Sequence, residues 1–209
     1  MLVVHHLNNS RSQRILWLLE ELGARYEIKF YQRDATTNLA PPELTAVNPL
    51  GKSPTITDGD ITLLESGAIV DYIQRKYGAG KLGAPAGAEA AEAYNQWLHY
   101  AEGSAMLPLM LNLYVMRLGE AGAPLQPRIQ GEMDNHLGYV DRALAGKDWL
   151  MGDFTAADVQ MSFVGEVARA FGQTAKHKNI AAWVERFQAR PAYVAALEKG
   201  GAYNLGPAK

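Results

Sequence analysis

Residues 2 to 31, LVVHHLNNSRSQRILWLLEELGARYEIKFY, contain the pattern that decides the fold. The runs Leu2–Leu7 and Tyr26–Tyr31 are short and rich in apolar, β-branched or aromatic residues, as strands are. Between them, apolar residues recur at helical spacing: Ile15, Leu18, Leu19 and Leu22. Gly23 follows as a helix stop signal. The stretch therefore predicts a β-α-β unit.

A hairpin and a second helix are predicted after this unit. The sequence Asp58-Gly59-Asp60 separates the apolar runs 54–57 and 61–64, and Asp-Gly between two such runs is a hairpin signal. Apolar residues then recur at helical spacing: Ile69, Val70, Ile73 and Tyr77. The order β-α-β, an irregular segment, then β-β-α predicts a mixed four-stranded sheet with helices packed on it.

The character of the sequence changes near residue 80. Residues 79–87 are rich in glycine and lack periodicity, so we expect a linker between a first domain, 1–78, and an all-helical domain, 88–209. Pro108 lies inside a long helical pattern and should kink or interrupt that helix. Thr155 and Asp158 have the spacing of a capping box and predict a helix start rather than chemistry.

The composition excludes several classes of function. The chain has 209 residues, 48% of them hydrophobic, and a net charge of −2. It therefore lacks the excess of basic residues that is typical of proteins that bind nucleic acid or an anionic membrane. The absence of cysteine removes disulfides and thiolate metal sites. His5 and His6 are adjacent in a predicted strand and would point to opposite faces, so they cannot chelate one metal ion. With no secretory signal or membrane-spanning run in sight, we expect a cytoplasmic protein.

Four segments, in this order and spacing, resemble the cytosolic glutathione transferases, of the serine type with a theta-like glutathione site. They are SRSQRILWLLEELGARYEI (10–28), NPLGKSPTITDGD (48–60), LLESGAIVDYI (63–73) and FTAADV (154–159). The resemblance implies a thioredoxin-like α/β domain followed by an all-α helical bundle. It also implies glutathione as co-substrate, no metal, a small hydrophobic electrophile and a homodimer.

The resemblance also implies contacts for glutathione. A cis peptide at Ser53–Pro54 would present the backbone of Ser53 to the cysteinyl residue, Ser66 would take the γ-glutamyl carboxylate, and Glu65 would face the ammonium or the adjacent amide. Lys52 would pair with the glycyl carboxylate, and Glu102 would reach the ammonium of a neighbouring subunit. The alternatives are a plain turn at the proline, a helix cap at Ser66 and a solvated lysine.

The chemistry requires a thiolate, and the helix start at residues 8–14 is the predicted place to make one. A free thiol with a pKa of about 8.5 is only about 3% ionised at pH 7. A decrease of about two units requires about 2.7 kcal/mol. A hydroxyl donor supplies about 1.5–3 kcal/mol and a helix N-terminus about 0.3–1, or about 2 when partly buried. Together these two effects suffice.

Ser10 is the predicted catalytic hydroxyl, counting back from Arg14, which matches an arginine of the family's first helix. Asn9 is the competing candidate, because some family members use an amide, and the backbone of Arg11 could assist. Ser12 is expected to face elsewhere. A cap at Ser10 with no catalytic role is the remaining alternative.

The electrophile is expected against the first long helices of the second domain. The candidate pocket residues are Tyr100, Ser104, Met106, Leu107 and Met110. The same stripe would suit an ordinary helix–helix core. The predicted reaction is conjugation, with hydroperoxide reduction or dehalogenation as related outcomes of the same thiolate. The alternatives are a relative that binds glutathione or hydrophobic ligands with little turnover, and one that has lost ligand binding.

Overall fold

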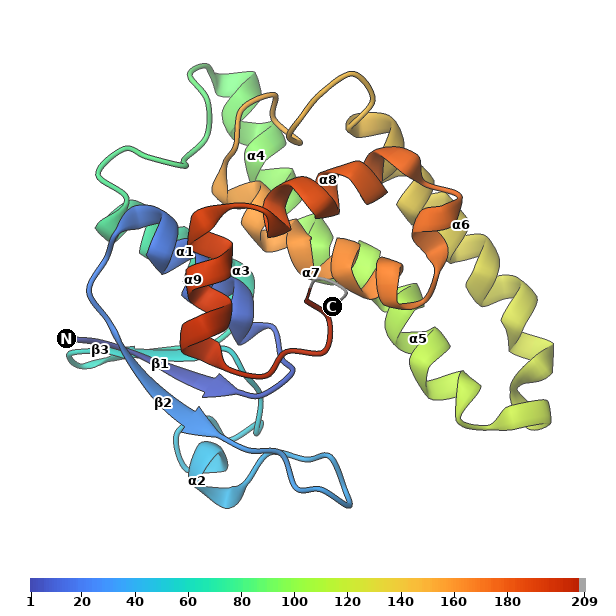
Figure 1. Cartoon of the computed structure of the whole chain (residues 1–209), viewed down its shortest axis with the longest axis horizontal. Coiled ribbons are helices and arrows are strands. Elements are labelled where there is room, and N and C mark those ends of the chain that lie inside the picture. Colours follow the sequence, from blue (N-terminus) through green and yellow to red (C-terminus); the bar gives the residue numbers. More distant parts are fainter. Residues whose placement is uncertain (207–209) are drawn as a thin grey trace. The chain divides into compact units, whose positions relative to one another are not determined.

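The structure is a computed structural model that describes residues 1–206 (Figure 1). Its contacts divide the chain into two compact units. One contains residues 1–83 together with the segment from Phe187 onward, and the other contains residues 84–186. The first boundary between the two units lies between residues 83 and 84, inside the predicted linker at residues 79–87. The segment from Phe187 onward, predicted with the helical domain, groups instead with the first unit.

The first unit is built on a mixed four-stranded sheet, as predicted. Its strands are β1 (Leu2–Leu7), β2 (Glu27–Tyr31), β3 (Thr55–Asp58) and β4 (Ile61–Leu63). The order across the sheet is β2-β1-β3-β4, with β1 parallel to β2 and antiparallel to β3, and β3 antiparallel to β4. The register pairs His6 with Phe30 and His5 with Thr55. The carboxyl end of β1, which leads into the candidate site, therefore lies between two paired strands.

Helices cover both faces of this sheet (Figure 1). They are α1 (Ser12–Leu22), α2 (Pro42–Thr45), α3 (Ser66–Tyr77) and α9 (Pro191–Gly200). On one face α1 packs against α3 and α9. On the other face Leu44 of α2 packs with Leu7 and Tyr31. Helix α1 ends at Gly23, whose φ of 64° is the left-handed conformation that glycine adopts without a steric penalty.

The C-terminal segment that starts at Phe187 is joined to α1 by aromatic and ionic contacts. Trp17 stacks on Phe187 with a ring-centroid separation of 5.4 Å and meets Tyr193 edge-on at the same distance. Arg190 forms a two-pronged ion pair with Glu21, with N–O distances of 2.5 and 2.8 Å. These contacts explain why a segment so distant in sequence belongs to the first unit.

The second unit is helical, as predicted. Its elements are α4 (Ala88–Tyr100), a π-helical turn (Ala101–Ala105), α5 (Met106–Met116), a 3₁₀ segment (Gly119–Leu125), α6 (Gln126–Ala143), α7 (Ala156–Ala170), a 3₁₀ turn (Gln173–Ala175) and α8 (Lys178–Gln188), which ends just past the division. Pro108 is the third residue of α5, three positions after Ala105, the last residue of the π-helical turn. The expected interruption is confirmed, and it takes the form of a wider turn, because proline cannot donate the regular i→i−4 bond.

The predicted capping box at the start of α7 is present. The Asp158 carboxylate accepts the backbone N–H of Thr155 at 3.0 Å. The same carboxylate also accepts the backbone N–H of Leu150 at 3.0 Å and the indole N–H of Trp183 at 3.1 Å. Burial raises the pKa of Asp158 to about 6, against the opposing effect of these hydrogen bonds. The box is therefore also the hub that ties α7 to α8.

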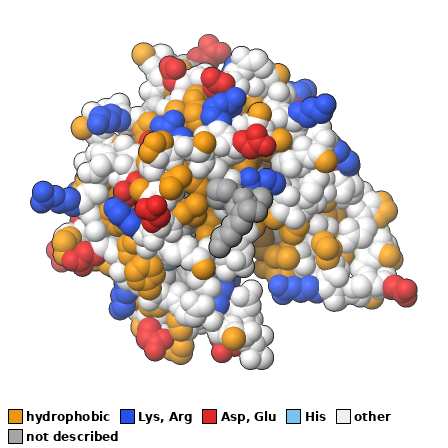
Figure 2. Space-filling view, in the orientation of Figure 1, with side chains coloured by type: hydrophobic (Ala, Val, Ile, Leu, Met, Phe, Trp, Pro, Cys, Tyr) orange, Lys and Arg blue, Asp and Glu red, His pale blue; other side chains and the backbone are white. Residues whose placement is uncertain are grey.

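Two features of the molecule concern its surface charge and the length of its helices. Figure 2 shows acidic and basic side chains interspersed over the face in view, without a patch of one sign. Among residues 1–206, no helix combines the length and the apolar character needed to cross a lipid bilayer.

Candidate active site

The turn from β1 to α1 is held in place by groups from distant parts of the first unit. The Arg33 backbone N–H donates to Asn8 Oδ1 at 2.8 Å, and the Arg33 side chain donates through Nε to the Asn8 carbonyl at 3.1 Å. Asn9 has a φ of 50°, and its Oδ1 accepts the backbone N–H of Asn204 at 2.8 Å. The turn is thus clamped by the loop after β2 and by the C-terminal segment. This clamp fixes the position of the next residue, Ser10.

Ser10 is buried and belongs to a chain of hydrogen bonds. Its Oγ lies 2.7 Å from Ser12 Oγ, and the Ser12 backbone N–H donates to it at 3.2 Å. Ser12 Oγ lies 2.9 Å from His6 Nδ1. Ser12 faces the interior of the unit rather than its surface, but its hydroxyl still contacts that of Ser10. The first turn of α1 directs this hydroxyl back between β1 and Ser10, where it is fully buried.

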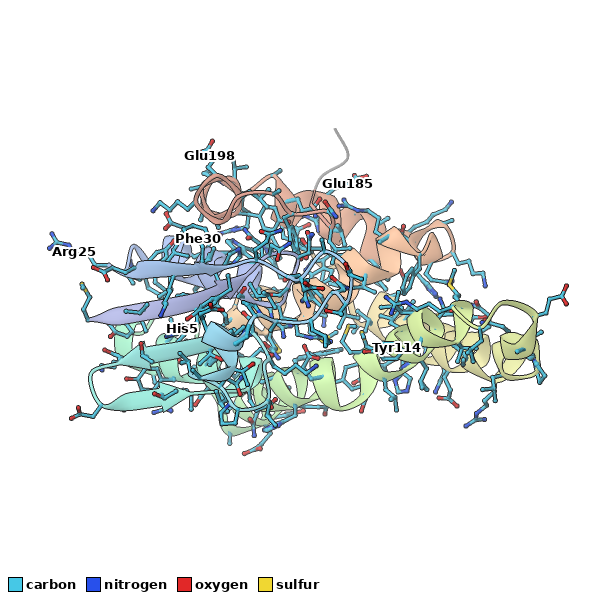
Figure 3. All side chains as sticks on the ribbon, turned by 90° about the horizontal axis from the view of Figure 1, so that it is seen from below. His5, Arg25, Phe30, Tyr114, Glu185 and Glu198 are labelled. Carbon is cyan, nitrogen blue, oxygen red and sulfur yellow. The ribbon has the colours of Figure 1, made fainter. Side chains whose placement is uncertain are left out.

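The two adjacent histidines lie on opposite faces of the sheet, as predicted. His6 faces α1, and its burial lowers its pKa to about 4, although the backbone of Gly200 favours the protonated ring. His5, which Figure 3 labels on the sheet, lies 2.8 Å from the Tyr31 hydroxyl through Nδ1 and 3.3 Å from Thr57 Oγ1 through Nε2. In the described part of the chain, no group of three or more metal-ligating side chains gathers.

Ser53 joins the start of β3 to the end of β1. Its Oγ donates to the His5 carbonyl at 2.9 Å and accepts the Leu7 backbone N–H at 3.3 Å. The Ser10 hydroxyl lies 3.4 Å from the same Oγ. The Ser53–Pro54 peptide is cis, as the resemblance implied. Within residues 1–206 the backbone N–H and C=O of Ser53 make no hydrogen bond.

Asn48 shapes the loop that leads to this edge. It is buried, and its Nδ2 donates to the Lys52 carbonyl at 2.9 Å and to Thr55 Oγ1 at 3.1 Å. Its Oδ1 accepts the Leu50 backbone N–H at 3.0 Å. The side chain of Lys52 itself is exposed. The side chain of Asn48 therefore supplies the hydrogen bonds that hold the backbone of this loop in shape.

Glu65 and Ser66 lie where the hairpin meets α3. Ser66 is the first helical residue and Glu65 holds the cap position, which corrects the expectation that Ser66 is the N-cap. Glu65 is exposed and has a φ of 67°, a costly conformation for a residue with a Cβ that is characteristic of ligand sites. The buried guanidinium of Arg14 donates to Ser66 Oγ. A fixed positive charge thus lies beside the N-terminus of α3.

The remaining candidates belong to the second unit. Glu102 and Ser104 are half-buried in the π-helical turn, and such turns are frequent at functional sites. Tyr100, at the end of α4, pairs with His136 Nδ1 at 2.8 Å, and burial raises the pKa of Tyr100 to about 12. Three further side chains of α5 differ in exposure: Met106 is buried, Met110 is half-buried and Leu107 is exposed.

Comparison with known proteins shows the family. Models of the glutathione S-transferase N-terminal and C-terminal domains match residues 1–75 and 103–191. The chain is 37% identical to glutathione S-transferase 3 of Schizosaccharomyces pombe, over 95% of this chain and 88% of that protein. The chain belongs to the glutathione S-transferase family. It is also 31% identical to glutathione S-transferase 1 of Saccharomyces cerevisiae, over 95% of each chain.

Solved structures extend the likeness to three dimensions. A glutathione S-transferase from Actinobacillus pleuropneumoniae superposes with a TM-score of 0.87 at 34% identity, covering 98% of this chain and 95% of that one. A family member from Pseudomonas fluorescens, solved with two glutathione bound, gives 0.79 at 27% identity, covering 94% and 92%. The protein is therefore a glutathione transferase that uses glutathione as its co-substrate, and the comparisons do not favour a relative that merely binds ligands.

Sequence reasoning missed three residues that shape the site of this transferase. Asn48 and Arg33 act through contacts with residues distant in the chain or in loops without periodicity, so no pattern marks them. His6 was assigned only to a strand. A signal for it was present, because a histidine on the face that packs against α1 needs a polar partner, and the serines at the helix start are the nearest candidates.

Proposed function

We propose that Ser10 is the residue that stabilises the thiolate of glutathione. The observation that carries the proposal is the 3.4 Å separation between the hydroxyls of Ser10 and Ser53. A cysteinyl residue that pairs with the open backbone of Ser53, like a short antiparallel strand, extends its sulfur toward Ser10. Ser10 also precedes the first residue of α1, so the positive end of that helix adds to the hydrogen bond.

The γ-glutamyl group is assigned to the start of α3. Its carboxylate would accept hydrogen bonds from the N-terminal N–H groups of α3 and from the Ser66 hydroxyl, whose oxygen is already engaged by Arg14. The exposed Glu65 carboxylate would face the ammonium. Lys52, exposed next to the Ser53 edge, is assigned to the glycyl carboxylate. The polar ends of the tripeptide would then fix its thiol over the α1 turn.

Asn9 is the weaker candidate for the thiolate partner. Ser10 has its hydroxyl 3.4 Å from Ser53 Oγ, whereas the Asn9 side chain accepts the backbone N–H of Asn204 through its Oδ1. This bond ties the amide to the C-terminal segment. We therefore assign Asn9 a role in holding the turn and keep Ser10 as the donor.

The thiolate would attack a small hydrophobic electrophile. With an aryl halide, a carbon–sulfur bond forms, the carbon–halogen bond breaks, and halide leaves while the thiol proton goes to solvent. Hydroperoxide reduction and dehalogenation use the same thiolate. The electrophile pocket is assigned to Tyr100, Ser104, Met106, Leu107 and Met110, where aromatic and thioether groups supply an adaptable apolar wall. We further propose a cytoplasmic homodimer in which Glu102 reaches the glutathione ammonium of the neighbouring subunit.

The test is the pKa of the bound thiol, read from the ultraviolet absorbance of the thiolate as pH is varied. Ser10→Ala should raise this pKa by about one to two units, because a hydroxyl donor to an anion contributes about 1.5–3 kcal/mol. The Kd for glutathione should change little. Asn9→Ala is the matched control and should leave the thiol pKa near that of the parent protein. If Asn9→Ala raises the pKa and Ser10→Ala does not, the assignment of Ser10 is wrong.

A further inference from the structure

Arg33, in the loop after β2, is held against the β1–α1 turn by neutral groups alone. It is half-buried, and its guanidinium donates to the backbone carbonyls of Asn8 at 3.1 Å and Asn38 at 3.0 Å. A third, longer contact of 3.5 Å joins Nη2 to the Asn9 carbonyl. Among the ion pairs of residues 1–206, none includes Arg33. Within the described residues, its positive charge is therefore not neutralised by a carboxylate.

The carboxylate next to Arg33 in sequence, that of Asp34, is engaged in its own loop. Asp34 Oδ1 accepts the backbone N–H and the hydroxyl of Thr37, at 2.7 and 2.8 Å, and the backbone N–H of Thr36 at 3.1 Å. The charge that acts on Arg33 is instead a like charge, because burial and then the Arg11 guanidinium lower the pKa of Arg33. A half-buried cation near a like charge is costly to keep in a fold, and such arrangements cluster at functional sites.

The turn brings the charge of Arg33 close to Ser10. The Asn9 carbonyl that Arg33 contacts belongs to the peptide bond between Asn9 and Ser10. Standard bond lengths limit the distance from that oxygen to Ser10 Oγ to about 5 Å, so the Arg33 nitrogen lies within about 9 Å of the hydroxyl. Two unit charges near a protein surface interact several times more strongly than in bulk water at the same distance. The charge of Arg33 can therefore act on an anion at Ser10 without touching it.

We propose that the Arg33 guanidinium is a fixed positive charge that stabilises the thiolate of glutathione at Ser10. A cation nearby favours the ionised sulfur over the neutral thiol, because only the ionised form carries a charge. Its effect adds to the hydrogen bond from Ser10 and to the N-terminus of α1. This inference rests on the proposed role of Ser10, which puts the sulfur over the same turn.

The other titratable groups around this position lie on β1, on α1 and beside the α3 and β3 ends of the site. His6 is neutral at pH 7, because its pKa is about 4. The Arg14 guanidinium is bonded to Ser66 at the start of α3. Glu65 and Lys52 are assigned to the ammonium and the glycyl carboxylate of glutathione. All of these groups stay in place when the charge of the β2 loop alone is removed, so the contribution of that charge can be measured separately.

The experiment measures the pKa of the bound thiol at saturating glutathione in charge variants of Arg33. Arg33→Gln keeps a side-chain N–H donor for the turn but removes the charge. It should raise the thiol pKa by about half to one unit and lower turnover near pH 6.5 by about two- to fivefold, with little change in the Kd for glutathione. Arg33→Lys keeps the charge and should stay close to the parent value.

Arg25→Gln is the matched control for the loss of one positive charge. Arg25 is exposed and precedes β2, whose first residue pairs with Val3 near the start of β1, whereas the turn follows the end of β1 (Figure 3). This variant should leave the thiol pKa unchanged, because the charge that it removes is far from the turn and is surrounded by solvent.

Salt separates an effect of charge from an effect of loop shape. The Debye length falls from about 10 Å at about 0.1 M salt to about 3 Å at about 1 M. The difference in thiol pKa between the parent protein and Arg33→Gln should therefore shrink to about half or less in 1 M sodium chloride.

The outcomes are distinct. If Ser10→Ala raises the thiol pKa while Arg33→Gln leaves it unchanged, the role of Arg33 is refuted and the role of Ser10 stands. If Arg33→Lys raises it as much as Arg33→Gln, or if the difference persists in full at high salt, the shape of the loop is responsible and the inference is refuted. A higher Kd for glutathione with an unchanged thiol pKa would show that Arg33 holds the tripeptide instead. If Ser10→Ala has no effect, the proposed function fails, and Arg33→Gln still decides whether the charge acts on the thiol.

Discussion

Replacement of His6 by asparagine should change how the stability of this transferase depends on pH. The folded protein holds the pKa of His6 at about 4, against 6.5 for an exposed histidine. Between these values the unfolded chain binds more protons than the folded one, so the free energy of unfolding rises with pH in this window. The contribution of His6 is thus fully present above pH 6.5 and is lost as pH falls toward 4.

The size of the effect follows from the two pKa values. One pKa unit corresponds to 1.36 kcal/mol, so the loss between pH 6.5 and 4 is about 3 kcal/mol. This is a large part of the about 5–15 kcal/mol that stabilises a typical folded protein. Asp158 acts in the opposite sense, because its raised pKa of about 6 makes the folded state bind more protons between pH 3.8 and 6. The wild-type curve alone therefore conceals part of the His6 effect.

The difference between His6→Asn and wild type isolates His6, since both chains keep Asp158. Asparagine places an amide near the position of Nδ1 but does not titrate. We expect the variant to gain about 3 kcal/mol relative to wild type as pH is lowered from 7.5 to 4, whatever its stability at pH 7.5. Urea unfolding followed by tryptophan fluorescence, in which the buried Trp17 reports on the first unit, measures this difference.

The comparison contains its own control. Above pH 7.5 the ring is almost wholly neutral in both states, so the two proteins should differ by a nearly constant amount between pH 7.5 and 8.5. Curves that stay parallel down to pH 4 would show that His6 is not buried in the neutral form, and the reasoning about its environment would fail.

Two further predictions concern buried hubs away from the sulfur. Asp158→Ala should cost about 3 kcal/mol or more in urea unfolding, because it leaves the N–H groups of Thr155, Leu150 and Trp183 without their acceptor. If the free energy of unfolding fell by less than about 1 kcal/mol, Asp158 would not be the acceptor that joins α7 to α8. Asn48→Ala should cost about 1–2 kcal/mol and weaken glutathione binding several-fold in calorimetric titration, because it releases the Lys52 carbonyl beside the Ser53 edge. Unchanged binding would mean that the loop holds its shape without Asn48.

The sequence by itself determined the elements of the fold, because their signals are local. The short apolar, β-branched run of β1, the apolar stripe of α1, the Asp-Gly turn and the capping box of α7 each rest on residues a few positions apart. Position in the chain also marked Ser10, Ser53 and Ser66 as candidates through their resemblance to a family. The sequence alone was therefore enough to indicate the class of protein.

The tertiary structure decided how the candidate residues are arranged. The contacts of Ser12 with His6 and Ser10 depend on how β1 packs beneath α1, and no local pattern predicts them. The clamp of Arg33 on Asn8 and the return of the C-terminal segment to Asn9 join parts of the chain about 25 and 195 residues apart. Such contacts are fixed by the packing of whole elements and by the need of buried polar groups for partners, and neither leaves a periodic trace in the sequence.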